Sequence, residues 1–223
     1  MLKALIQLIC FFLPWALRRR ALKIFCGFSI DPSARVGLSI ILADEFEIAR
    51  GAKLGHFNYI GRLDKLLMEE ETFLGNFNWV LGLSQRLNSQ FYAKKPNRRS
   101  ELVLGRCSMI AHQNYIDCTD RIELRPFSAI AGARSQLMTH GVEPITSRQT
   151  CGPIVIGELT MVGSGCMIMK GVKIPSCCIV SAGSVVSHAK PESYALIAGN
   201  PAVQIRKLPE TAKIFSRTTM VIN

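Results

Sequence analysis

Residues 156–186 read IGELTMVGSGCMIMKGVKIPSCCIVSAGSVV. An aliphatic residue recurs in this stretch at every sixth position, and a small residue often follows it. The recurring residues are Ile156, Val162, Ile168, Ile174, Val180 and Val186. A period of six fits neither the 3.6-residue period of an α-helix nor the two-residue alternation of a strand. It fits a coil with three short flat faces, in which each hexapeptide forms one face and one corner.

The same period runs through most of the chain, with a slip of two residues near Ile122. The earlier in-frame residues are Ile30, Val36, Leu42, Ile48, Leu54 and Ile60, then Met68, Leu74 and Val80, then Leu104, Ile110, Ile116 and Ile122, and after the slip Leu124 and Ile130. Coils built this way stack at a strand spacing of about 4.8 Å. We therefore predict an all-β fold that buries one continuous apolar axis.

This pattern resembles the hexapeptide-repeat acyltransferases over roughly residues 30–208. The resemblance implies a left-handed parallel β-helix over 28–208, an exception to the usual right-handed crossover rule. It leaves an N-terminal helix over 1–27 and a short C-terminal helix and tail over 209–223. The period is lost at 83–101 and 141–153. We predict loops there, because long loops on a rigid scaffold commonly carry function.

Composition narrows the classes of partner. The chain of 223 residues has a net charge of +11, which favours an anionic partner such as phosphate groups or a membrane surface. No zinc-finger spacing or aromatic RNA-binding motif accompanies that charge, so we expect no nucleic-acid partner. The eight cysteines include no C-x-x-C pair, so we expect reduced core residues and no metal site.

The first residues form an apolar segment followed by basic residues. Residues 2–17 read LKALIQLICFFLPWAL, and Arg18, Arg19 and Arg20 follow. The segment is shorter than the roughly 20 residues of a spanning helix and is interrupted by Pro14. We predict a helix that lies in the membrane interface, on the inner face of the cytoplasmic membrane. A helix that packs on the protein or caps an oligomer, and a true transmembrane anchor, are the alternatives.

His140 is the candidate catalytic residue. It lies in QLMTHGVEP, where the repeat breaks, and the repeat returns fourteen residues later at GPIVIGELTMVG. In sugar acetyltransferases of the resembled family, a loop at this place carries the catalytic histidine. An imidazole can accept a proton at neutral pH from a hydroxyl or amine that attacks a thioester. We regard His56 and His112 as structural or acceptor-site residues.

A carboxylate commonly orients such a base. Because of the slip near Ile122, we expect a residue on one coil to align with the residue twenty positions later, which places Asp120 beneath His140. Asp117 and Glu143 are alternatives. Asn114 and Asp117 are the candidate acceptor-binding residues.

The acyl-donor site follows from the resemblance alone. The C-terminal coils read VGSGCMI, VSAGSVVSHAKP and IAGNPAVQIRKL, where related enzymes line a groove for the donor. By motif position, Ser164, Ala182 and Gly199 would line the acetyl-CoA site, and Arg206 would meet its phosphates. The chain departs from the family at His188, where lysine is usual; Lys190 or Lys207 would replace that contact.

Together these features predict an acetyltransferase that uses acetyl-CoA, acts on a hydroxyl or amine of a sugar or glycan, and serves cell-surface polysaccharide synthesis. The resemblance implies a homotrimer. Two alternatives stay open: an acyltransferase whose donor is an acyl carrier protein, and a non-catalytic scaffold at the membrane. A zinc enzyme of the carbonic anhydrase type is disfavoured, because the four histidines are widely spaced.

Overall fold

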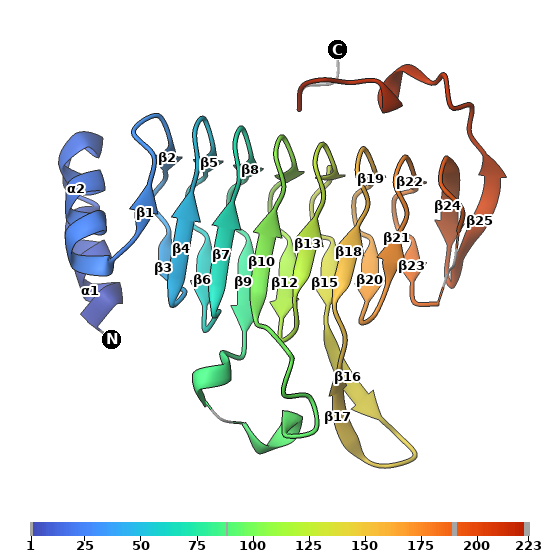
Figure 1. Ribbon diagram of the computed structural model, residues 1–223, viewed down its shortest axis with the longest axis horizontal. Coiled ribbons are helices and arrows are strands. Elements are labelled where there is room, and N and C mark those ends of the chain that lie inside the picture. The colour runs from blue at the N-terminus through green and yellow to red at the C-terminus, as the bar shows by residue number, and fades with distance from the viewer. Residues whose placement is uncertain (1, 88, 189–190, 221–223) are drawn as a thin grey trace.

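The computed structural model describes residues 2–87, 89–188 and 191–220. The chain forms a three-sided parallel β-helix whose coils stack along the long axis of the molecule (Figure 1). Two helices, α1 (Leu2–Cys10) and α2 (Trp15–Cys26), close the N-terminal end. A two-stranded antiparallel unit, β16 (His140–Glu143) and β17 (Arg148–Cys151), projects from the side. The predicted fold class is confirmed.

Each side of the prism is one sheet. Sheet A consists of β1 (Ser29–Ile30), β4 (Glu45–Ile48), β7 (Lys65–Met68), β10 (Glu101–Leu104), β13 (Ile122–Leu124), β18 (Ile154–Ile156) and β21 (Lys173–Ile174). Sheet B consists of β2 (Arg35–Val36), β5 (Lys53–Leu54), β8 (Phe73–Leu74), β11 (Met109–Ile110), β14 (Ala129–Ile130), β19 (Met161–Val162), β22 (Ile179–Val180), β24 (Ala195–Gly199) and β25 (Ala202–Lys207). Sheet C consists of β3 (Ile40–Leu42), β6 (Tyr59–Gly61), β9 (Trp79–Gly82), β12 (Tyr115–Cys118), β15 (Gln136–Met138), β20 (Met167–Met169) and β23 (Val185–Val186).

The hexapeptide period positions the core. The in-frame aliphatic residues point to the axis and are almost entirely buried, which contributes roughly 1.5–3 kcal/mol for each large side chain. The prediction that Leu42 points to the axis is wrong. Ile41 is fully buried in β3, whereas Leu42 is only half-buried, because the preceding corner is one residue shorter than its counterpart in the next coil.

One corner is reinforced by a ladder of buried amides. The side-chain carbonyl of Asn58 accepts the backbone N–H of Asn78 at 2.8 Å, and that of Asn78 accepts the N–H of Asn114 at 2.9 Å. The carbonyl of Asn114 in turn accepts the N–H of Ser135 at 2.9 Å. These bonds satisfy the backbone donors where the chain turns from sheet B to sheet C.

The N-terminal helices seal the open end of the prism. Gln7 exchanges two hydrogen bonds of 2.8 Å with the backbone of Ile41, and Arg18 donates to the carbonyl of Val36. The first strands of sheets C and B therefore do not present free edges. The predicted single helix is two helices, separated near Pro14. No helix in the described part of the chain is long and apolar enough to cross a membrane.

The C-terminal segment is less helical than predicted. It contains a single 3₁₀ turn, η3 (Lys213–Phe215), and no α-helix among its described residues. The segment folds back along the prism (Figure 1). Arg217 donates to the carbonyl of Phe127, and the rings of Tyr194 and Phe215 pack edge to face at 5.5 Å.

Candidate active site

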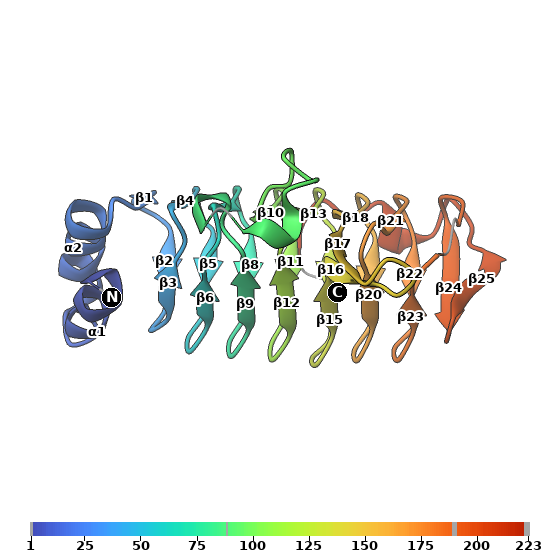
Figure 2. The same cartoon turned by 90° about the horizontal axis from the view of Figure 1, so that it is seen from below.

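The two segments that interrupt the repeat both project from the same corner of the prism, where the chain passes from sheet C to sheet A. Residues 83–100 follow β9 and carry two 3₁₀ turns, η1 (Gln85–Leu87) and η2 (Gln90–Tyr92). Residues 141–153, predicted as a loop, belong to the β16–β17 hairpin, which begins at His140 two coils further on. The two projections stand side by side below the prism (Figures 1 and 2). The coil between the two projections has a short corner without an insertion, Thr119–Arg121. This corner forms the floor of the space between the projections.

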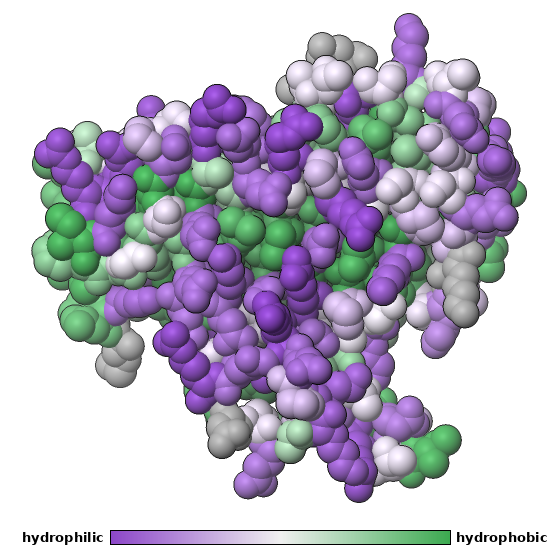
Figure 3. Space-filling model, viewed as in Figure 1, coloured by the Kyte–Doolittle hydropathy of each residue, from purple (hydrophilic) through white to green (hydrophobic). Residues whose placement is uncertain are grey.

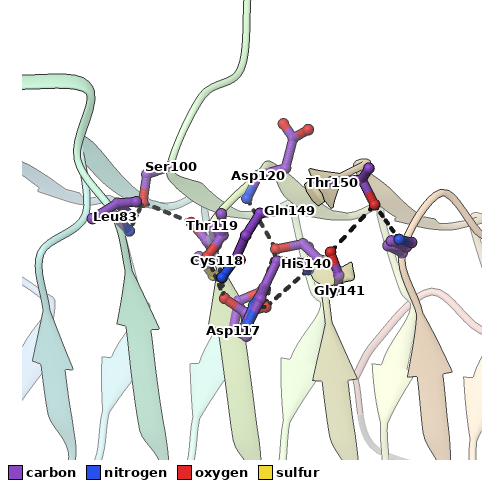
Figure 4. Close-up of polar contacts among 12 residues, drawn as sticks. Leu83, Ser100, Asp117, Cys118, Thr119, Asp120, His140, Gly141, Gln149 and Thr150 are labelled. Carbon is purple, nitrogen blue, oxygen red and sulfur yellow. Dashed lines mark hydrogen bonds and ion pairs between the residues drawn. The ribbon is translucent and has the colours of Figure 1, made fainter. Parts of the chain in front are cut away.

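At this floor His140 meets Asp117. The imidazole Nδ1 lies 2.5 Å from Asp117 Oδ2, and the backbone N–H of His140 donates to the same oxygen at 3.0 Å. The two side chains point toward each other from β16 and the end of β12 (Figure 4). The His140 side chain is 38% exposed, whereas that of Asp117 is 5% exposed. The carboxylate is thus buried behind an imidazole that solvent and ligands can reach.

Asp117 is itself held by its neighbours. Its Oδ1 accepts the N–H of Thr119 at 3.0 Å and the hydroxyl of Thr119 at 2.7 Å. Thr139, the residue before the histidine, donates its hydroxyl to the backbone carbonyl of Asp117 at 2.7 Å. The bonds from Thr119 satisfy the buried carboxylate, and the bond from Thr139 fixes the backbone beside it, so that the ring it contacts is held in place.

The prediction that Asp120 lies beneath His140 is wrong. The Asp120 carboxylate points away from the imidazole (Figure 4) and accepts the N–H of Arg121 at 2.9 Å. The twenty-residue offset holds in sheet A, where Leu102 pairs with Ile122. In sheet C, however, Ile116 pairs with Leu137, twenty-one residues on. The corner before β15 holds one more residue, so Asp120 no longer aligns with His140. Asp117 pairs with Met138, and its carboxylate reaches the histidine two residues further on.

Two other predicted residues also lie elsewhere. Asn114 belongs to the buried amide ladder and is 2% exposed, so the prediction that it contacts an acceptor is wrong for this structure. Glu143 is three residues beyond His140 on β16, and its carboxylate accepts the N–H of Ile145 at 3.3 Å. Because successive residues of a strand face opposite sides, Glu143 and His140 face apart.

Sequence reasoning missed three residues near the histidine. Cys151 pairs with His140 across the hairpin, and burial raises the pKa of its thiol to about 11. Arg98 is buried and donates to the carbonyl of Thr119 at 2.7 Å, beneath the ring of Tyr92 at 5.1 Å. Tyr92 donates to Gln149 of the hairpin at 3.0 Å. All three lie in the two segments that interrupt the hexapeptide repeat. The sequence has no period there from which the direction of a side chain could be predicted.

No family model matches the chain. The candidate acetyltransferase YJL218W of Saccharomyces cerevisiae is 41% identical over 58 residues, which are 26% of this chain and 29% of that protein. A chloramphenicol acetyltransferase of Klebsiella aerogenes is 39% identical over 59 residues, 26% of this chain and 28% of the relative. The matched regions thus span less than a third of the length of these relatives.

One solved structure resembles nearly the whole β-helix. The polysialic acid O-acetyltransferase OatWY matches 81% of this chain and 84% of its own length, with a TM-score of 0.58 and 12% sequence identity. The chain has the fold of the hexapeptide-repeat acyltransferases.

Within this acyltransferase fold, the predicted donor residues lie away from His140. Ser164 and Ala182 are exposed on successive coils at the corner between sheets B and C. Gly199 is the last residue of β24, before the turn to β25, and Arg206 is exposed on β25. Sheet C separates the B–C corner from the corner of His140, so a single chain does not bring the two groups together. Lys190, the predicted substitute phosphate contact, lies outside the described residues.

The described part of the chain contains no cluster of histidine, cysteine, aspartate or glutamate that could hold a metal ion. The described cysteines, all eight, are buried and unpaired with one another. The side chains at the corner include an imidazole, a carboxylate and hydroxyls, groups that can transfer protons.

Proposed function

We propose that the protein transfers an acetyl group from acetyl-CoA to a hydroxyl or amine of a sugar or glycan acceptor, in the synthesis of a cell-surface polysaccharide. The contact between Asp117 and His140 carries this proposal. A buried carboxylate that bonds Nδ1 of a partly exposed imidazole selects the tautomer whose Nε2 is a free proton acceptor.

With this tautomer, His140 can act as the base in the transfer reaction. As the acceptor oxygen attacks the thioester carbonyl, its proton passes to His140 Nε2 and a new C–O bond forms. The C–S bond of the tetrahedral intermediate then breaks, and the proton on Nε2 passes to the departing sulfur. The products are the acetyl ester and the free thiol of CoA, and the imidazole is neutral again. An amine acceptor would give an amide by the same steps.

The neighbouring thiol does not suit a covalent route. Cys151 lies opposite His140, but it is buried and the pKa of its thiol is raised to about 11. The thiolate, which is the nucleophilic form, is therefore scarce at neutral pH. Direct transfer from the thioester needs no enzyme nucleophile.

The comparisons support a sugar acceptor. The matched solved structure is described as an O-acetyltransferase of polysialic acid, and both curated relatives are described as acetyltransferases. A carrier-protein donor and a non-catalytic scaffold remain the alternatives. The first predicts transfer from an acyl carrier protein but not from CoA, and the second predicts no thioester turnover.

We further propose a homotrimer in which one copy supplies His140 and a neighbour supplies the donor groove. The separation of Ser164 and Ala182 from His140 supports this arrangement, as does the outer face of sheet C between them. Among the strand residues that the structure describes on that face, the buried Asp117 is the one charged side chain, and the face presents a row of aromatic rings: Tyr59, Trp79 and Tyr115. A monomer in sedimentation velocity at micromolar concentration would reject this arrangement.

We propose that α1 and α2 dock the protein on the cytoplasmic membrane from its inner face. Their inner sides pack on the prism, but the helices and the turn between them expose nine large apolar side chains: Leu2, Leu5, Leu8, Ile9, Phe12, Leu13, Leu17, Ile24 and Phe25. This hydrophobic surface shows at the left edge of Figure 3. Arg20 and Lys23 are exposed beside it and suit anionic headgroups.

The test of the proposed activity is the release of CoA thiol with glycan fractions from cells that contain the protein. We expect His140→Ala to lower kcat by roughly 10²–10⁴-fold without a change in melting temperature. His56→Ala removes an exposed histidine on the first coils and is the matched control, with normal turnover expected. Normal turnover by His140→Ala would overturn the assignment of the base.

A further inference from the structure

The two projections at the His140 corner enclose a cleft of about 660 Å³. One wall is formed by residues 90–95 of the first projection, and the other by Val142 and residues 146–150 of the hairpin. The bond between Tyr92 and Gln149 joins the two walls. A volume of this size suits a small-molecule or sugar ligand.

The cleft adjoins the hairpin that carries the imidazole. In the hairpin His140 is opposite Cys151 and Val142 is opposite Gln149. Because alternate residues of a strand share a face, His140, Val142 and Gln149 project on the same side of the hairpin. Val142 and Gln149 line the cleft, so a ligand in it extends toward the base. Arg148 and Thr150, which alternate with Gln149 on β17, also line the cleft, and Thr150 accepts a hydrogen bond from Lys170.

The first projection is anchored to the residues that hold the base. Arg98 donates to the carbonyls of Leu83 and Thr119, and the Thr119 hydroxyl donates to Asp117. The cleft wall and the catalytic carboxylate therefore share one hydrogen-bonded framework. A ligand held by this wall is positioned relative to His140.

The charge of the lining is uniformly positive. Lys94, Lys95 and Arg148 line the cleft, all three are exposed, and no acidic residue lines it. Within the described chain none of the three forms an ion pair with a carboxylate. On sheet A, by contrast, Arg121, Arg125 and Lys65 are all paired with glutamates. Three unpaired cations in one cleft are available to a bound anion.

The other lining groups suit a sugar. Phe91 presents a largely exposed ring, and Gln90, Thr146 and Ser147 supply amide and hydroxyl groups that can bond hydroxyls. Lys95 also lies close enough to Cys151, the cross-strand partner of His140, to oppose the rise of its pKa. Positive charge therefore extends from the outer wall to the reacting corner.

We infer that this cleft binds the acceptor and that the acceptor is anionic, a sugar that carries carboxylate or phosphate groups. This inference rests on the proposed function, and it adds the substrate class. Lys94, Lys95 and Arg148 hold the anionic group, and the sugar ring lies toward Phe91. The reacting hydroxyl or amine then faces Nε2 of His140.

The test is binding of three probes that share N-acetylglucosamine, measured by calorimetry at low and at physiological salt. A hyaluronan tetrasaccharide carries carboxylates, UDP-N-acetylglucosamine carries phosphates, and chitotetraose is neutral. We expect at least one anionic probe to bind about tenfold more tightly than chitotetraose at low salt. The stronger of the two anionic probes identifies the group that the cleft prefers.

The triple variant K94Q/K95Q/R148Q should lose this preference while it keeps its affinity for acetyl-CoA within about twofold. The control K53Q/K173Q/K213Q removes the same charge from exposed sites on the prism and the C-terminal segment, and should keep the preference. Equal binding of all probes, or equal loss in both triple variants, would overturn the inference. A loss of acetyl-CoA affinity confined to the first variant would also overturn it, since the cleft would then hold the donor.

These outcomes are separable from failure of the proposed activity. His140→Ala should bind the anionic probes as the wild type does, because the imidazole acts on the reacting group and not on the anion. If wild-type protein shows the charge preference but never turns over acetyl-CoA, the acetyltransferase proposal fails. If it turns over acetyl-CoA without the preference, the inference about the cleft fails.

Discussion

A single carboxylate decides how His140 can act. In the proposed mechanism, the contact of Nδ1 with Asp117 holds the ring proton there and leaves the lone pair of Nε2 for the acceptor. Asp120 is nearby in sequence but is engaged by the backbone of Arg121. The difference between the two aspartates is one of geometry: the first faces the imidazole, and the second does not.

That difference predicts contrasting effects of two conservative substitutions. Asp117→Asn places an N–H donor against Nδ1 and favours the wrong tautomer, so we expect kcat to fall by about 10- to 100-fold while the KM for acetyl-CoA stays within about twofold. Asp120→Asn should change kcat by less than about threefold. Steady-state kinetics of both variants is the measurement. A larger loss in Asp120→Asn than in Asp117→Asn would contradict the role given to Asp117.

At this scale the sequence predicts His140 as the base and names Asp117 only as an alternative to Asp120. His140 stands at the break in the repeat, where the resembled family carries its catalytic histidine. Its partner depends on the number of residues in one corner. The corner before β15 is one residue longer than the spacing of the aliphatic residues suggests, which takes His140 out of line with Asp120, and its side chain contacts Asp117 instead.

At the scale of elements, the hexapeptide period predicts the strands well and the projections poorly. Each strand needs only one inward aliphatic residue and a turn, both of which are local. The hairpin instead depends on pairing between His140 and Cys151 and on contacts with Tyr92, which lies about 50 residues earlier in the chain. Long-range contacts of this kind leave no periodic signal in a sequence.

The helices α1 and α2 give the element-scale prediction about membranes. Phe12 is 91% exposed and Ile24 is 74% exposed, so Phe12→Ser combined with Ile24→Ser removes two apolar side chains without opening the core. Each contributes roughly 1.5–3 kcal/mol when buried in lipid, so we expect at least a tenfold loss in binding. Flotation with phosphatidylglycerol vesicles measures it.

The matched control for that flotation experiment lies at the opposite end of the molecule. Val203 and Ile205 on β25 are both 55% exposed, and their replacement by serine should leave vesicle binding unchanged. Equal loss in the two pairs would show that general hydrophobicity, and not the N-terminal helices, drives the association.

At the scale of the whole molecule, three different regions of the surface present different kinds of side chain. The N-terminal end presents apolar side chains, the C–A corner presents His140 with its basic cleft, and the C-terminal coils present the predicted donor residues. The sequence predicted the prism because one apolar axis runs through it. It could not predict that Ser164 and His140 lie at different corners, because that separation depends on where each hexapeptide falls around the coil.

The proposed mechanism requires Asp117 to act through His140, at the corner from which both projections extend. A double-mutant cycle on kcat tests this coupling, with Asp117→Asn, His140→Gln and the combined variant measured in one assay of CoA release. If the carboxylate serves only to hold the imidazole, the combined variant should be no slower than His140→Gln, within about twofold. Losses that multiply would contradict the account, because the two residues would then act independently.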